Sequence, residues 1–283
     1  MKLLTFYKEG RLQPGILTEK GILDISGAYP TMIEAIERHK GLDDFLDFAM
    51  EAETNFFIEL HKTKLGPSID CPEKIICVGL NYRQHAIESG MAVPDNPILF
   101  SKFRNSLSGD KNIVRIPSEA KQVDYEAELA IIIGKKACKV SEVEAEDVIF
   151  GYSAANDLSE RSFQFRTSQW LLGKNLDGFC PIGPYIVTKD EIEDSDKLRI
   201  KCTVNNEVRQ DSNTNDMIFK CKALVSYISH HMTLTPGDVI LTGTPEGVAM
   251  GHGGEVQPWL KAGDEVVVEI EQLGRLTTYI QTE

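Results

Sequence analysis

The chain has 283 residues, 42% hydrophobic and 26% charged, a composition that provides a large apolar core for one or two domains. Its net charge of −13 argues against nucleic acid or an anionic membrane as a partner, because both would be repelled by this surface. We therefore expect a small-molecule partner, and an anionic one would need a bound divalent cation to supply positive charge locally.

The six cysteines are scattered without a C-x-x-C pair, and several lie in apolar runs such as KIICVGL, so we expect reduced core residues. No window contains the roughly 18 apolar residues that a membrane span requires. The apolar run in the N-terminal stretch MKLLTFYKEG is too short for a signal peptide. These features predict a cytoplasmic protein.

The predicted elements fall into two units. Residues 1–66 begin with short alternating strands and continue with two segments of helical periodicity, TMIEAIERH and LDDFLDFAMEA. After a boundary at GPSIDCPEK, residues 72–283 are mainly strands separated by Gly, Pro, Asn and Asp turns, with one longer helix over 217–232. This order predicts a β-rich α+β fold, a mixed β roll or barrel preceded by a small N-terminal α+β domain.

The segment VGLNYRQHAIESG predicts a strand followed by a short helix that carries His85 and Glu88. At a spacing of three residues the two side chains share one helical face, where the carboxylate can hold one imidazole nitrogen and leave the other free for a proton. A solvated helix with an incidental histidine is the alternative. The segment continues through Gly90, Pro94 and Pro97, so residues 81–97 are predicted to act as a lid.

Three acids at strand positions suggest a metal site. In VDYEAELAIIIG the two-residue period of a strand directs Glu126 and Glu128 to one face, and Asp157 ends the apolar run FGYSAA. An E-x-E pair on an exposed strand is the alternative, but LAIIIG indicates a strand buried on both faces. Buried acids need a neutralising cation, and oxygen ligands favour Mg²⁺, Mn²⁺ or Ca²⁺.

Two further segments offer polar groups for a substrate. Lys174 lies among apolar residues in SQWLLGKNLDGFCPIGP, with Asp177 as its expected partner, and can stabilise an oxyanion or extend to the surface. The strand and turn GDVILTGTPEGV presents Thr242 and Thr244, whose hydroxyls and backbone N–H groups suit a carboxylate or enolate oxygen. A purely structural turn is equally compatible with that composition.

Five blocks occur in the order GLNYRQHAIESG, DYEAELAIIIG, GYSAANDLSERSFQ, GKNLDGFCPIGP and GDVILTGTPEGV. In this order they resemble the fumarylacetoacetate hydrolase family over about residues 72–283, and residues 1–66 resemble the N-terminal domain of its longer members. The resemblance implies a homodimer with a β-rich roll around a divalent metal, Mg²⁺ or Mn²⁺, which Ca²⁺ can replace in crystals. It implies metal ligands at Glu126, Glu128 and Asp157, a catalytic dyad of His85 and Glu88, an active-site Lys174, and substrate-facing Arg83, Gln164 and Thr244.

The resemblance also sets the expected reaction. The first expectation is hydrolysis of a C–C bond in a 2,4-diketo acid or acylpyruvate through a metal-bound pyruvate enolate, with water activated by His85 and Glu88. The alternative uses the same enolate for decarboxylation or tautomerisation of oxaloacetate, or for isomerisation of 2-hydroxyhepta-2,4-diene-1,7-dioate. A non-catalytic metabolite sensor with structural Ca²⁺ is the third interpretation, which the adjoining dyad and lysine disfavour.

Overall fold

The computed structural model describes residues 1–39, 45, 47, 57–253 and 256–283. Within this part of the chain, eleven strands form the largest sheet. In spatial order they are β4 (Phe57–Ile58), β3 (Gly21–Asp24), β2 (Arg11–Thr18), β1 (Lys2–Lys8), β13 (Cys180–Thr188), β11 (Ile149–Asn156), β10 (Ala127–Ile133), β16 (Val239–Leu241), β5 (Ile75–Gly79) and β6 (Ile98–Lys102), with β7 (Leu107–Ser108) beside β13.

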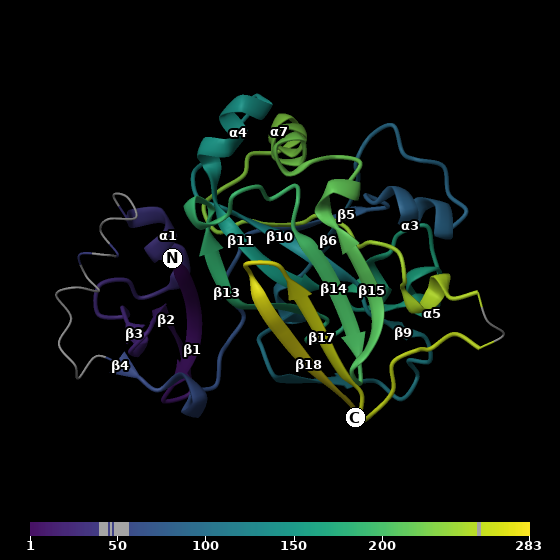
Figure 1. Ribbon diagram of the computed structural model, residues 1–283, viewed down its shortest axis with the longest axis horizontal. Helices are drawn as coiled ribbons and strands as arrows, with labels where there is room; N and C mark the ends of the chain where they lie inside the picture. The colour runs from purple at the N-terminus through teal and green to yellow at the C-terminus, as the bar shows by residue number, and fades with distance from the viewer. Residues whose placement is uncertain (40–44, 46, 48–56, 254–255) are drawn as a thin grey trace.

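A second, five-stranded sheet packs against the middle of the first. Its order is β15 (Glu207–Asn213), β14 (Arg199–Val204), β17 (Glu265–Ile270), β18 (Gly274–Thr282) and β8 (Asn112–Ile116). Figure 1 shows β17 and β18 crossing in front of β10 and β11, and buried aliphatic side chains of both sheets form one core between them. The short pair β9 (Val123–Asp124) and β12 (Ser159–Glu160) lies beside this core.

The helices are short and lie at the edges of the sheets. They are α1 (Met32–Arg38), α3 (Arg83–Glu88), α4 (Glu142–Val148), α5 (Arg161–Gln164), α6 (Leu171–Lys174) and α7 (Cys221–His231). Helices α4 and α7 pack together at one end of the molecule (Figure 1), and a capping box between Ser141 and Glu144 begins α4. None of the helices in the described residues is long and apolar enough to cross a bilayer.

The predicted β-rich α+β fold with few helices is confirmed. The helix predicted over 217–232 begins later, at Cys221, because residues 214–216 form a 3₁₀ turn and Met217 makes a β-bridge with Tyr82. The predicted helical segment LDDFLDFAMEA lies outside the described residues except for Phe45 and Asp47.

Among the strands that were not predicted, β15 and β18 are the longest. β15 is largely polar, so its sequence lacks apolar alternation, yet it pairs with β14 through a tight turn at Asn205 and Asn206, both with positive φ. β18 follows β17 after a turn and continues the same sheet. Pairing with β14 therefore stabilises β15 despite its polar sequence, whereas β18 also buries Leu276 and Ile280 in the core.

The first 66 residues join the large sheet directly. β1 pairs antiparallel with β13, with Lys2 opposite Val187 and Leu3 opposite Ile186, so β1 to β4 extend that sheet at one edge (Figure 1). The predicted division into domains 1–66 and 72–283 stays a prediction. The pairing of β1 with β13 shows that backbone hydrogen bonds connect the two segments.

Candidate active site

Two adjacent strands bring the three predicted metal ligands together. β10 pairs antiparallel with β11, with Ala127 opposite Asn156, so Glu126 and Asp157 lie side by side at the ends of the paired segments. The backbone N–H of Asp157 donates to the carbonyl of Glu126 at 2.9 Å. Glu126, Glu128 and Asp157 are all buried, and each offers a carboxylate oxygen within 4.8 Å of the others.

Lysine side chains from two other elements neutralise part of this charge. Nζ of Lys174, on α6, lies 2.6 Å from Oε2 of Glu126 and 2.8 Å from Oδ2 of Asp157. Nζ of Lys102, at the end of β6, donates to Oδ1 of Asp157 at 2.5 Å. Sequence reasoning missed Lys102, although alternation in ILFSK places it on the same strand face as Ile98 and Phe100.

Arg161, at the start of α5, connects the acids to the rest of the site. Its guanidinium donates to Oε1 of Glu126 at 2.6 Å, to Oδ2 of Asp124 at 2.9 Å and to Oε1 of Gln164 at 2.9 Å. Asp124 also accepts the backbone N–H groups of Ala249 and Met250, so it holds that segment beside the site. Sequence reasoning missed Arg161 and Asp124, because nothing local to either residue indicates these partners.

The carboxylates differ in how well they are neutralised. Burial opposes ionisation of Glu126, but the charges of Lys174 and Arg161 outweigh it and lower its pKa to about 2. Burial raises the pKa of Glu128 well above its usual value, and the neighbouring Asp157 and Glu126 raise it further. Glu128 accepts the backbone N–H of Gly243 at 2.7 Å and forms no ion pair with the lysines or arginine of the site. The buried oxygen-only donor set therefore fits a hard divalent cation such as Mg²⁺ or Mn²⁺.

The predicted pair on α3 is formed. Nδ1 of His85 lies 3.3 Å from Oε2 of Glu88, whose other oxygen accepts the backbone N–H of Gly247 at 3.0 Å. His85 is only 5% exposed, and no group among the described residues is hydrogen-bonded to its Nε2. This arrangement orients the imidazole and leaves one ring nitrogen available for proton transfer.

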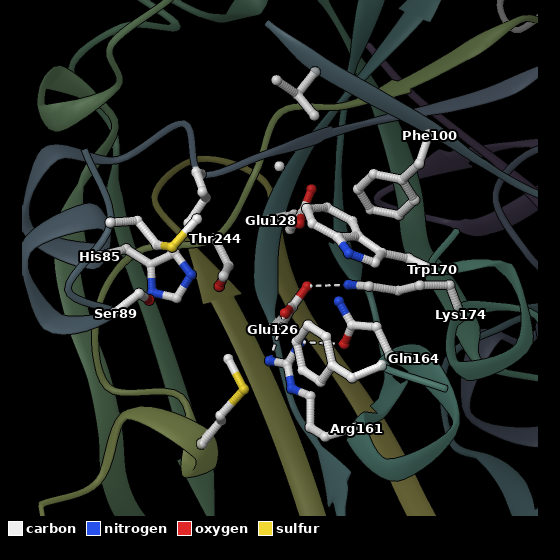
Figure 2. A pocket seen from close by; sticks show the side chains of 16 residues that line it. His85, Ser89, Phe100, Glu126, Glu128, Arg161, Gln164, Trp170, Lys174 and Thr244 are labelled. Atoms are coloured by element: carbon white, nitrogen blue, oxygen red, sulfur yellow. Dashed lines mark hydrogen bonds and ion pairs between the residues drawn. The ribbon is translucent and has the colours of Figure 1, made fainter. Parts of the chain in front are cut away.

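A cavity of about 220 Å³ is lined by His85, Glu126, Glu128, Arg161 and Lys174, among others. In Figure 2, His85 and Thr244 lie on one side of it, Glu126 and Glu128 at its base, and Lys174 on the other side. Apolar and aromatic side chains complete the lining, including those of Met91, Phe100, Phe165, Trp170 and Met250. The cavity thus combines a charged base with largely apolar walls, as small-molecule sites commonly do.

An aromatic wall supports the lysine. The rings of Trp170 and Phe100 meet edge to face with centroids 5.2 Å apart, and Nζ of Lys174 lies 4.9 Å from the Phe100 centroid. A Cβ added to Gly79 would lie 2.6 Å from the Trp170 ring. Glycine at position 79 therefore lets the indole reach its place in the wall.

The structure does not bring every predicted residue into the cavity. Arg83 is exposed on α3 and is not part of the lining, whereas Gln164 and Thr244 line it. Asp177 is not the partner of Lys174; it accepts a hydrogen bond from Asn105 on the surface. The Thr242 hydroxyl donates to the carbonyl of Leu129 inside the core and is not available to a ligand.

Comparisons with known proteins identify the family of the chain. Residues 74–281 match the family model described as fumarylacetoacetate (FAA) hydrolase C-terminal. The chain is 42% identical, over 97% of its length and 90% of the relative's, to oxaloacetate tautomerase Fahd2a, mitochondrial, from Rattus norvegicus.

Two solved structures show the same fold. Fumarylacetoacetate hydrolase from Exiguobacterium antarcticum is 34% identical with a TM-score of 0.85, covering all of both chains. Maleylpyruvate hydrolase from Sphingobium sp. SYK-6, in complex with manganese(II) ion and pyruvate, is 30% identical with a TM-score of 0.83, covering 100% of this chain and 99% of that one.

The same comparisons correct the predicted location. The expectation of a cytoplasmic protein is contradicted by the rat tautomerase and by similar relatives from Xenopus laevis and Homo sapiens, all of which are named as mitochondrial. The expectation was drawn from the lack of apolar spans. That feature concerns insertion into membranes and does not distinguish one aqueous compartment from another.

Proposed function

This chain belongs to the fumarylacetoacetate hydrolase family, and we propose that it is a divalent-metal-dependent enzyme that interconverts the keto and enol forms of oxaloacetate or a related 2-oxo acid. One observation carries the proposal: Glu126 and Glu128, beside the buried Asp157, face the same cavity as the uncommitted Nε2 of His85. A cation site and a proton-transfer group are the two elements that enolisation requires. The identity of 42% to an oxaloacetate tautomerase supports the choice of substrate.

Glu126, Glu128 and Asp157 would hold the cation, with Mg²⁺ or Mn²⁺ as the metal that this oxygen donor set suits. The cation, when bound, supplies positive charge that stabilises negative charge on the 2-oxo oxygen. The related maleylpyruvate hydrolase structure, which contains manganese(II) and pyruvate, supports both the metal and the class of ligand.

The protein's own groups move the proton and hold the charge. In the keto-to-enol direction, Nε2 of His85 accepts a proton from the carbon beside the 2-oxo group, while Glu88 stabilises the protonated imidazole. The 2-oxo oxygen takes up a proton from water and the imidazolium returns its proton to water, so the protons balance, and the reverse reaction follows the same steps backwards. Burial opposes the charged form of Lys174, but Asp157 and Glu126 outweigh it and raise its pKa. Lys174 therefore stays protonated and acts as a fixed positive charge rather than as an acid.

The test follows the enol of oxaloacetate by its ultraviolet absorbance in the presence of Mg²⁺ or Mn²⁺. The protein should accelerate approach to the keto–enol equilibrium, and His85→Ala should lose about 10²-fold or more in rate while retaining metal. A protein that binds metal but leaves the equilibration rate of oxaloacetate and of other 2-oxo acids unchanged would refute the proposal.

Hydrolysis of a C–C bond in an acylpyruvate is the second candidate, and the same dyad favours it. With His85 positioned by Glu88, a water molecule beside Nε2 can be deprotonated for attack on the distal carbonyl. Product analysis separates the two reactions, because hydrolysis yields pyruvate plus a carboxylic acid and tautomerisation yields no new carbon skeleton.

We also propose that the protein is a homodimer, as the family resemblance implies, and light scattering would test this oligomeric state.

A further inference from the structure

A buried glutamine from the second sheet contacts the turn that carries Thr244. Gln210, on β15, is 1% exposed. Its Nε2 donates to Oγ1 of Thr244 at 2.8 Å and to the carbonyl of Pro245 at 2.9 Å, and its Oε1 accepts the backbone N–H of Ala127 at 3.0 Å. Gln210 thus joins the strand that carries the acids to the turn that lines the cavity.

These partners determine which way the amide faces. The N–H of Ala127 can only donate and the carbonyl of Pro245 can only accept, so the oxygen and nitrogen of Gln210 cannot be exchanged. Oγ1 of Thr244 is therefore an acceptor of the remaining amide proton. No acceptor in the described part of the chain takes the hydroxyl proton of Thr244, whose side chain lines the cavity in Figure 2.

The cations of the site are already committed to acids. Lys102 and Lys174 contact Asp157, and Arg161 contacts Asp124 and Glu126. A substrate carboxylate is an acceptor only, so a neutral donor that faces the cavity can add to its recognition beside the bound cation. Without the hydrogen bond from Gln210, the Thr244 hydroxyl could face the cavity either as a donor or as an acceptor. With it, the hydroxyl proton is directed to a ligand.

We propose that Gln210 is a positioning residue that makes the Thr244 hydroxyl a hydrogen-bond donor to the carboxylate of the 2-oxo acid substrate. The inference rests on the proposed function, since it presumes a 2-oxo acid in the cavity. Gln210 does not touch the substrate in this arrangement. It acts through the direction of one hydrogen bond.

The test measures binding of oxalate in the presence of Mg²⁺ by calorimetry, using Gln210→Met, which keeps side-chain length but has no donor. Gln210→Met and Thr244→Val should each weaken oxalate binding about tenfold or more, the loss expected for a hydrogen bond to a charged group. The double variant should bind oxalate as Thr244→Val does, because the glutamine acts only through the hydroxyl.

Thr242→Val is the matched control. It removes a hydroxyl from the same turn, but that hydroxyl donates to the core carbonyl of Leu129, so oxalate affinity should stay within about twofold of wild type. Thr244→Ser should retain affinity, and Mn²⁺ affinity without oxalate should be unchanged in both single variants. If Gln210→Met fails to fold, Gln210→Glu keeps an acceptor for Ala127 while removing the donors.

The outcomes separate this inference from the proposed function. Wild-type oxalate affinity in Gln210→Met, or equal losses from Gln210→Met with and without the Thr244 hydroxyl, would overturn the positioning role alone. Wild-type protein that binds Mg²⁺ but not oxalate would overturn the proposed function and this inference together.

Discussion

Lys174→Met tests whether the acid cluster requires positive charge. The Lys174 side chain is 2% exposed, and its Nζ makes ion pairs of 2.6 and 2.8 Å with Glu126 and Asp157. Removing one partner of a buried ion pair destabilises a protein by about 3–5 kcal/mol. Without Lys174, Arg161 would be the remaining cationic partner of Glu126 and Lys102 that of Asp157. With an unfolding entropy of about 2.1 cal/mol/K per residue, a chain of 283 residues should lose about 5–8 °C in melting temperature.

Thermal unfolding with and without Mg²⁺ or Mn²⁺ is the assay. A divalent cation restores the missing charge, so it should raise the melting temperature of Lys174→Met by several degrees more than that of wild type. Lys197→Met is the control, since Lys197 pairs with Asp194 at a similar distance of 2.7 Å but on the surface, and little change is expected. Equal melting temperatures for the two variants, or the same metal effect on both, would show that the reasoning is wrong.

Two further predictions concern the walls and mouth of the cavity. Gly79→Ala should displace the Trp170 ring, because the added Cβ would lie 2.6 Å from it. Steady-state assays should show kcat/KM at least several-fold lower, with Mn²⁺ affinity unchanged. Gly27→Ala is the control, since its Cβ would meet open space, and it should match wild type. Oxalate plus Mg²⁺ should slow hydrogen exchange in residues 81–97 if this segment closes as a lid, and unchanged exchange would exclude closure.

Much of the candidate site was predictable because its patterns are local. The two-residue period of a strand places Glu126 and Glu128 on the same side, and three-residue spacing on a short helix places His85 beside Glu88. These relations depend only on backbone geometry within one element. The β-rich fold was predictable for the same reason, since most strands show apolar runs between turn residues.

The sequence by itself therefore determined most of the apolar strands, the carboxylate cluster and the dyad. Only the tertiary structure decided what surrounds them: Lys102 meets Asp157 across 55 positions of sequence, and Gln210 reaches Thr244 from another sheet. Arg83, equally polar, lies outside the cavity. Local periodicity specifies the face on which a side chain projects, whereas the partner that it meets depends on how distant strands pair and how the two sheets pack.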